Sequence, residues 1–207
     1  MKRTIIVMSS LVILSCLLGS CKKKDTSTTQ DETPAPVVNP LCDGNGSSSY
    51  FPLVLNNYWK YYFVGQSQEP TLTVIGTNTY NSKSYFRLED NTGLMQVSDI
   101  YLREVSSSHD IMAYNSSTNS ESLYLPGSPT LNQTWAYTSS ISRKVTNLSA
   151  TYTTSSCSYT GLLEITVSVN GSVTDKEYYK KGLGMVASVS QGIFGGMTFK
   201  IEALSLK

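Results

Sequence analysis

The chain carries few side chains that could perform acid–base or nucleophilic chemistry together. His109 is its single histidine. Asp110 follows it, but adjacent residues on a strand point to opposite faces and cannot jointly hold an ion. The serines fall in polar runs such as 106–108 and 155–156, which turn and edge positions explain better than a nucleophile paired with a base. We therefore expect no catalytic residues and no metal site.

Paired carboxylates and a phosphate-binding loop are the remaining signals for an enzyme. The acids at 89–90 and 175–177 lie where turns or exposed strand faces are expected, whereas general acid and base catalysis needs two groups held across a cleft in different environments. The Gly-Leu-Gly at 182–184 lacks the helix whose N-terminus would receive a phosphate, and indicates a strand break or bulge. We expect a non-enzymatic protein without a cofactor, and a hydrolase is the least favoured alternative.

The N-terminus is typical of a lipoprotein signal peptide. Lys2 and Arg3 precede an apolar run that is short for a bilayer, and Leu-Gly-Ser at 18–20 stands immediately before Cys21. Cleavage after residue 20 would leave Cys21 at the new N-terminus, where it is acylated. The sequence thus predicts a bacterial cell-envelope location, as an outer-membrane lipoprotein that faces either the periplasm or the cell surface, with the membrane as a partner through this lipid.

Two cysteines remain once Cys16 leaves with the signal and Cys21 takes the lipid. Because exported proteins meet an oxidising compartment, Cys42 and Cys157 are candidates for a disulfide. Such a bridge would close a loop of about 115 residues, which the chain-entropy model credits with nearly 5 kcal/mol. Two free thiols are the alternative.

The charge distribution argues against nucleic acid as a partner. The formal net charge is +1, and no basic stripe occurs in the later part of the chain. The one concentrated charge is the lysine run at 22–24, which an anionic membrane surface would attract.

Residues 21–49 have the composition of a disordered, lipidated tether, since they are polar and contain few side chains that could form a core. Pro34, Pro36 and Pro40 would stiffen the middle of the tether. Residues 50–207 then have the size of a single β domain.

Period-two alternation of apolar and polar residues dominates from residue 50 onward and indicates antiparallel strands. Trp59 and Tyr61 lie on one face of the first run, for example, and Lys60 on the other. Asn170-Gly171 is the strongest hairpin signal, and 81–82 and 91–93 predict further turns. Further strands are expected near 71–79, 83–89, 99–106, 110–115, 121–125, 134–140, 143–153, 161–169, 172–180, 184–190 and around 199–203.

About a dozen strands and little helix make this an all-β chain. So many strands cannot remain a flat, open sheet without exposing an apolar face. We expect a curved antiparallel sheet that forms a partial or closed barrel, mostly as a meander, with a sandwich as the alternative.

Aromatic residues are abundant, with 14 Tyr, 5 Phe and 2 Trp. Core packing explains most of them. If the sheet curls, inward aromatic side chains could also line a cavity for an apolar molecule, and outward ones could stack on sugars. Trp59, Tyr61 and Trp135 are the candidates for ligand binding.

Four short motifs resemble β-rich envelope lipoproteins of Bacteroidota. They are Tyr-Phe-Pro-Leu at 50–53, Asn-Tyr-Trp-Lys-Tyr at 57–61, Gln-Thr-Trp at 133–135, and Tyr-Lys-Lys-Gly-Leu-Gly-Met-Val at 179–186. The resemblance implies a curved sheet or partial barrel that is similar in outline to lipocalin-like and lipoprotein-carrier folds. It implies an architecture and no activity.

These observations favour a membrane-anchored envelope lipoprotein that presents a β domain for non-catalytic binding. Its partner would be an apolar or glycan ligand, or another envelope protein. A structural or accessory subunit of an envelope complex is the alternative, and an uncovered sheet edge or apolar patch would be its mark.

Overall fold

The computed structural model describes residues 40–65, 67, 69–92, 100–190 and 198–206. The predicted signal peptide, Cys21 and the tether as far as residue 39 lie outside the described residues. The described part forms one short helix and twelve strands. Their bounds are α1 Pro40–Asp43, β1 Tyr58–Phe63, β2 Thr71–Tyr80, β3 Lys83–Asp90, β4 Ile100–Glu104, β5 Ile111–Asn115, β6 Ser120–Leu125, β7 Thr134–Ala136, β8 Ile141–Thr153, β9 Ser158–Val169, β10 Ser172–Lys180, β11 Gly184–Ser190 and β12 Thr198–Ser205.

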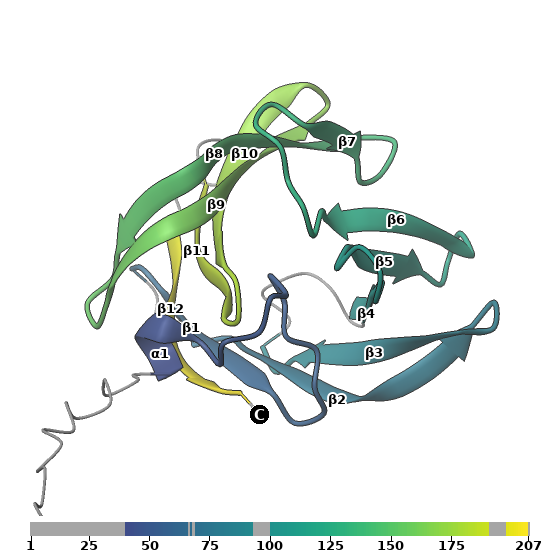
Figure 1. The fold of residues 1–207 in the computed structure, drawn as a ribbon, viewed down its shortest axis with the longest axis horizontal. Helices are drawn as coiled ribbons and strands as arrows, with labels where there is room; N and C mark the ends of the chain where they lie inside the picture. Colours follow the sequence, from purple (N-terminus) through teal and green to yellow (C-terminus); the bar gives the residue numbers. More distant parts are fainter. Residues whose placement is uncertain (1–39, 66, 68, 93–99, 191–197, 207) are drawn as a thin grey trace, which may run out of the picture. The chain divides into compact units, whose positions relative to one another are not determined.

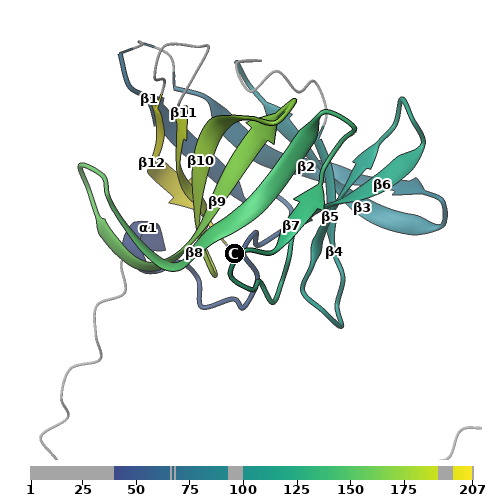
Figure 2. The ribbon, with the colours of Figure 1, turned by 90° about the horizontal axis from the view of Figure 1, so that it is seen from above.

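All twelve strands belong to one antiparallel sheet. Its order is β6-β5-β4-β3-β2-β1-β12-β11-β10-β9-β8-β7. Neighbours in the sheet are neighbours in the sequence except for β1 and β12, and the consecutive strands β6 and β7 form the two ends of the sheet. The sheet curls until its two ends, β6 and β7, approach each other (Figures 1 and 2). The predicted all-β fold is confirmed. It is a meander that forms a nearly closed barrel, with one unsealed seam between β6 and β7.

Alternation along the strands places the core inside the barrel. In β1, the side chains of Trp59, Tyr61 and Phe63 are buried, whereas Tyr62 between them is exposed. The same pattern brings branched apolar residues of the other strands into one interior cluster, which includes Leu72, Val74, Leu88, Leu102, Ile111, Val145, Leu162, Ile165 and Ile201. Burial of these side chains explains why the sheet curls instead of remaining open.

Two of the predicted hairpin turns have the backbone that their sequences suggest. Asn170 and Gly171 join β9 to β10 with φ values of 50° and 82°, the positive angles that a tight hairpin turn requires. Asn81 and Ser82 join β2 to β3 with φ values of 49° and 60°. The predicted turn at 91–93 is described only to residue 92, and the glycines at 192, 195 and 196 lie outside the described residues.

The strand expected over 134–140 is shorter in the structure. β7 ends at Ala136, residues 137–140 form a turn, and β8 begins at Ile141. The Thr138 hydroxyl accepts hydrogen bonds from the backbone amides of Ser140 (3.3 Å) and Ile141 (3.0 Å). A side chain that binds nearby amides in this way competes with the strand ladder, so that this polar run turns where alternation alone predicted a strand.

The folded unit includes residues 40–49, which the sequence analysis assigned to the tether. Cys42 is joined to Cys157 by a disulfide with a Cα–Cα distance of 5.5 Å. Tyr159 donates a hydrogen bond to the Leu41 carbonyl, and Lys180 donates one to the Cys42 carbonyl, both at 2.8 Å. A crosslink and backbone contacts thus join this polar segment to the strands of the barrel.

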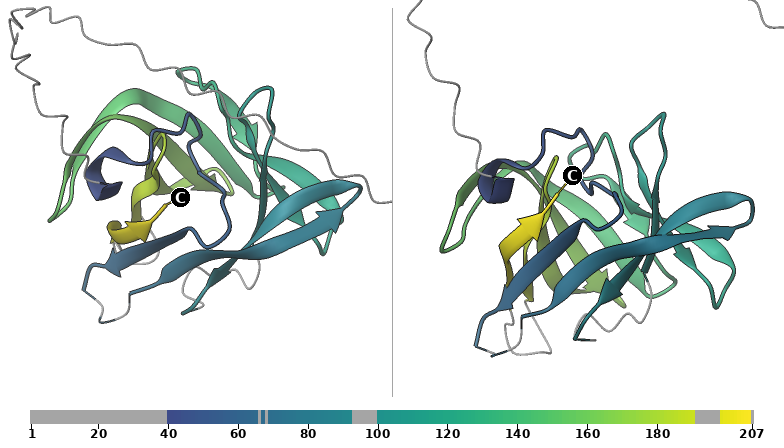
Figure 3. Two further views of the ribbon diagram at one scale, coloured as in Figure 1. Left: turned by 60° about the horizontal axis from the view of Figure 1, so that its bottom comes forward. Right: turned by 90° about the horizontal axis from the view of Figure 1, so that it is seen from below.

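The segment that follows α1 covers one end of the barrel (Figures 1 and 3). Phe51 lies at its centre and is buried, with ring centroids 4.6 Å from Trp59 of β1 and 6.4 Å from Tyr124 of β6. Trp59 donates a hydrogen bond to the Leu183 carbonyl at 2.5 Å. A Cβ at Gly184 would lie 2.7 Å from that indole nitrogen, which explains why this position is a glycine.

We predict that the disulfide makes a large contribution to stability. Replacing both Cys42 and Cys157 with serine should lower the free energy of unfolding by up to about 5 kcal/mol, because the open chain regains loop entropy. Urea unfolding of the Cys21→Ser protein with and without the double replacement measures the loss. Thiol titration of the unreduced, denatured Cys21→Ser protein is the control, and two free thiols in the described domain would contradict the bridge.

Candidate ligand-binding site at the barrel seam

Side chains, and not backbone hydrogen bonds, hold the seam together. Within the described residues, β6 and β7 share no strand pairing. Instead, Arg143 of β8 donates from Nη1 to the carbonyl of Tyr124 in β6 at 3.2 Å. Its guanidinium lies 4.5 Å from the centroid of the Tyr124 ring and 5.8 Å from that of Tyr137. The Tyr124 and Tyr137 rings themselves meet edge to face at 5.8 Å, so that three side chains span the gap.

Arg143 is at the same time the centre of a polar network in the barrel interior. Its side chain is 3% exposed and forms an ion pair with Glu177 of β10, which is 17% exposed. Tyr179 donates to the same Glu177 carboxylate at 2.7 Å, and its hydroxyl lies 3.2 Å from that of Tyr124. Burial raises the pKa of Tyr179 well above its ordinary value, so that the hydroxyl remains a donor to Glu177.

Three polar atoms around this network are buried and have no hydrogen-bond partner among the described residues: Tyr61 Oη, Trp135 Nε1 and Arg143 Nε. Trp135 lies opposite Arg143 in the β7–β8 ladder, so that both side chains belong to the same face of the sheet. Burial raises the pKa of Tyr61, and nearby Tyr124 raises it further. A buried donor without an acceptor costs about 1–3 kcal/mol, so these atoms are suited to an additional hydrogen-bonding group.

A groove of about 460 Å³ lies against the seam. One wall is the β5–β6 hairpin and the other is the 137–140 turn. Most of the described residues that line the groove carry a hydroxyl group, and none of them is charged. The hydroxyl-bearing residues of the lining include Thr118, Ser120, Ser122, Tyr137 and the Thr-Ser-Ser at 138–140. Tyr137 lines the groove and also contacts Tyr124 and Arg143 at the seam, so that it connects the groove to the polar network.

The three residues expected to bind a ligand have different environments. Trp59 is fully buried, and its indole nitrogen is bonded to Leu183, so that it serves the core and the N-terminal segment. Tyr61 and Trp135 instead carry two of the unpaired interior atoms.

Sequence reasoning missed the charged centre of the site. Glu177 was expected on a solvated face, but it pairs with buried Arg143. The alternation did contain a signal, since Arg143 is in phase with buried Val145, and Glu177 is in phase with buried Tyr179.

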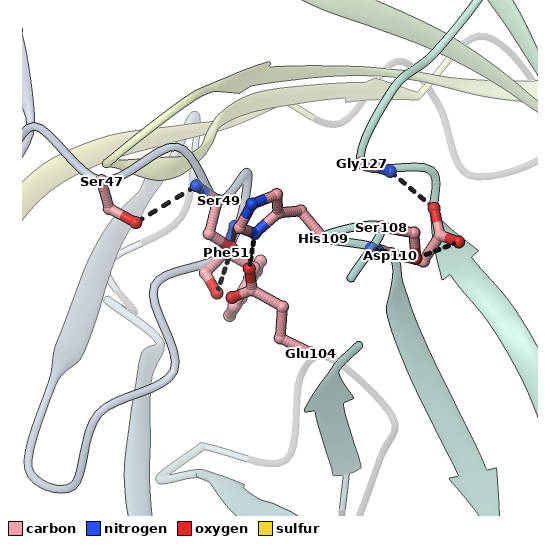
Figure 4. Close-up of polar contacts among 8 residues, drawn as sticks. All are labelled: Ser47, Ser49, Phe51, Glu104, Ser108, His109, Asp110 and Gly127. Atoms are coloured by element: carbon pink, nitrogen blue, oxygen red, sulfur yellow. Dashed lines mark hydrogen bonds and ion pairs between the residues drawn. The ribbon is translucent and has the colours of Figure 1, made fainter. Parts of the chain in front are cut away.

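Ser108, His109 and Asp110 of the β4–β5 turn make contacts that shape the turn (Figure 4). His109 Nδ1 lies 2.5 Å from Glu104 Oε1. Asp110 accepts hydrogen bonds from the Ser108 hydroxyl and from the Gly127 amide, both at 2.8 Å. His109 and Asp110 thus contact different groups. In the described part of the chain, no cluster of three His, Cys, Asp or Glu residues could hold a metal ion.

A second polar cluster lies on the face of β3–β6 that points away from the interior. Glu121 accepts hydrogen bonds from Arg103 at 2.5 Å, Lys83 at 2.7 Å and Tyr85 at 2.8 Å. Burial raises the pKa of Glu121, but these three donors outweigh burial and lower it from 4.5 to about 2. The cluster therefore ties the tips of neighbouring hairpins together as long as Glu121 is ionised.

Together, the fold and the site define a twelve-stranded antiparallel barrel with a polar groove at an unsealed seam. No protein-family model matches the chain, and no curated protein matches it. Among solved structures, it is similar to a protein of Bacteroides fragilis described as a predicted exported protein with a YmcC-like fold. The TM-score is 0.41 and the identity 11%, over 75% of this chain and 98% of that one. At this level of similarity, the match supports no inference about function.

No helix in the described part of the chain is long and apolar enough to cross a membrane. Anchoring by a lipid at Cys21 stays a prediction from the sequence, because this residue lies outside the described part.

We predict that the Arg143–Glu177 pair is essential for stability. Arg143→Met should lower the free energy of unfolding by about 3–5 kcal/mol, because it leaves a carboxylate buried without its cation. Adding Glu177→Gln should restore part of the loss. Denaturant unfolding of the single and double variants measures both effects.

The exposed Lys60–Glu69 pair offers the matched control, since its side chains are 35% and 40% exposed. Glu69→Gln should change stability by less than about 1 kcal/mol. An Arg143→Met protein that is no less stable than Glu69→Gln would contradict the role of the buried pair.

We further predict an acid-sensitive contribution from Glu121. Because its folded pKa is about 2 and its ordinary value is 4.5, the unfolded chain takes up the proton first as the pH falls. The stabilisation is complete above about pH 4.5 and is lost between pH 4.5 and pH 2. Thermal unfolding across this range should show a shallower decline for Glu121→Gln than for the parent protein, and equal slopes would count against the cluster.

Proposed function

We propose that this protein is a membrane-anchored lipoprotein of the bacterial cell envelope whose β domain binds a ligand without catalysis. The observation that supports this proposal is the groove of about 460 Å³ at the seam. Its volume is in the range of small-molecule sites, and it combines an aromatic side chain with several convergent polar groups. The sequence supports the anchor, because residues 1–21 have the features of a lipoprotein signal.

The contacts of the acidic residues favour binding over hydrolysis. A hydrolase of the expected kind would need two acids that face each other across a cleft. The described residues lining the groove include no carboxyl group. Glu177 forms an ion pair with Arg143 and accepts a hydrogen bond from Tyr179.

The test is native mass spectrometry of the domain expressed in the periplasm with Cys21→Ser and purified without organic solvent. We expect an adduct that denaturation releases. Tyr137→Ala should lower its occupancy at least tenfold, about 1.4 kcal/mol, because the variant removes the aromatic wall of the groove. The matched control is Tyr62→Ala on the opposite side of the barrel, where an exposed tyrosine of β1 lies far from the seam in strand order.

An adduct that both variants retain equally would count against the groove as the binding site. A protein without any adduct in the periplasmic preparation, and unchanged in mass after incubation with an envelope extract, would count against ligand binding.

An accessory subunit of an envelope complex is the second candidate, and the unpaired edges of β6 and β7 favour it. Edges of this kind can pair with a strand of another protein. Crosslinking in membranes from Ser120→Cys, on β6, should then capture one stoichiometric partner, whereas Ile75→Cys, at an exposed position of β2 in the middle of the sheet, should not. Without such a partner, the accessory role loses its support.

A further inference from the structure

We propose that the seam groove selects an uncharged, hydroxyl-rich ligand, a neutral glycan, and that the buried Arg143 network contributes hydrogen-bond donors to it. This inference rests on the proposed function, since it names the ligand class of the same groove.

The walls of the groove are the first argument. Each serine, threonine and tyrosine hydroxyl in the lining can both donate and accept a hydrogen bond. Some use part of this capacity within the protein, as Thr118 with Ser120, and the capacity that remains is what a ligand can use. An apolar ligand would remove these groups from water without replacing their hydrogen bonds, at about 1–3 kcal/mol for each group left unpaired. Sugar hydroxyls have the same dual capacity as the wall and can satisfy both roles.

Charge is the second argument. The described lining residues carry no charged side chain. Arg143, whose guanidinium lies 5.8 Å from the ring of the lining residue Tyr137, is already compensated by Glu177. An anionic group in the groove would approach that carboxylate, and a cationic group would approach the guanidinium. A neutral ligand avoids both repulsions and the cost of desolvating a charge.

Unpaired donors beside the seam favour the same ligand class. Trp135 Nε1 and Arg143 Nε can only donate, and both are buried without an acceptor among the described residues. They belong to one face of the sheet at paired positions of β7 and β8, and neither lines the groove. Within the described residues, the contact of Tyr124 with Tyr137, the bond from Arg143 to the Tyr124 carbonyl and the contacts of the Arg143 guanidinium with both rings bridge the seam. Separation of the two rings would bring these donors to the groove, where ligand oxygens can accept from them.

The aromatic rings supply the fourth argument, because a sugar ring presents an apolar face as well as hydroxyl groups. Tyr137 belongs to the groove wall and lies against Tyr124. Once the rings separate, the face of Tyr137 offers a stacking surface of the kind that aromatic side chains provide.

The experiment titrates the Cys21→Ser protein with three kinds of probe. The neutral probes are oligomers of glucose, mannose and N-acetylglucosamine, the acidic probe is oligogalacturonate, and the apolar probe is palmitate. Calorimetry measures binding, and tryptophan fluorescence reports on the surroundings of Trp135, opposite Arg143 in the β7–β8 ladder. Trp59 is fully buried and bonded to Leu183, so that Trp135 is the indole expected to respond.

We expect a neutral oligosaccharide to bind and to shift the tryptophan emission, and Trp135→Phe to abolish the shift. Tyr137→Ala should weaken binding at least tenfold, and Tyr62→Ala should leave it unchanged. Ser120→Val, at an exposed position of the wall, should weaken binding about threefold to tenfold, which corresponds to one lost hydrogen bond. This second variant keeps the test valid if Tyr137→Ala does not fold.

Binding of palmitate or oligogalacturonate in place of the neutral probes, with the same dependence on Tyr137, would overturn the ligand class and leave the proposed binding function intact. If a neutral oligosaccharide binds equally well to the parent protein, Tyr137→Ala and Ser120→Val, the assigned site is wrong. Binding without a change in the emission of Trp135 would also overturn it. If no probe binds, the inference is wrong, and the native mass measurement then decides the proposed function on its own.

Discussion

The Arg143–Glu177 ion pair is the interaction on which the seam and the interior both depend. A guanidinium that is 3% exposed requires a compensating charge, and β10 provides it. The same side chain then uses its other terminal nitrogen, Nη1, and its flat face to contact Tyr124. One residue of β8 thus links β6 to β10, which are separated by almost the whole sheet in strand order. Charged hydrogen bonds are strong in a buried site. Arg143 can therefore connect β6 to β10, although these two strands share no backbone ladder.

A different device closes the end of the barrel. Phe51 fills the interior between Trp59 and Tyr124, and the disulfide of Cys42 with Cys157 holds the start of the same segment. The first part of this segment, residues 40–49, is polar and would gain little from burial alone, so the crosslink supplies the constraint that composition does not. With that end covered, the seam is where the described structure leaves a groove. Its hydroxyl-rich walls are therefore part of the surface that the protein presents to its surroundings.

The sequence predicted the strands well because alternation and turn chemistry are local. Trp59 and Tyr61 against Lys60, and Asn170 with Gly171, needed no knowledge of distant residues. Two kinds of feature could not be predicted from the sequence. The hydroxyl of Thr138 ended β7 early by a side-chain bond that alternation does not register. Arg143 and Glu177 occupy inward positions, but a charged residue at such a position reveals its partner only when the curl of the sheet brings β8 and β10 to the same interior.

The unsealed edges of β6 and β7 also bear on what the protein can bind. β7 has three residues, and β6 is followed directly by Pro126, which has no backbone amide to donate. Short edge strands and prolines are the features by which natural sheets avoid pairing with other chains. The Tyr124 carbonyl is in addition already bonded to Arg143. An incoming strand would therefore find few free backbone groups in a row, whereas a small ligand needs only the side-chain hydroxyls and rings beside the seam. The short β7, Pro126 and the bonded Tyr124 carbonyl thus favour the proposed small, hydroxyl-bearing ligand over a partner that adds a strand.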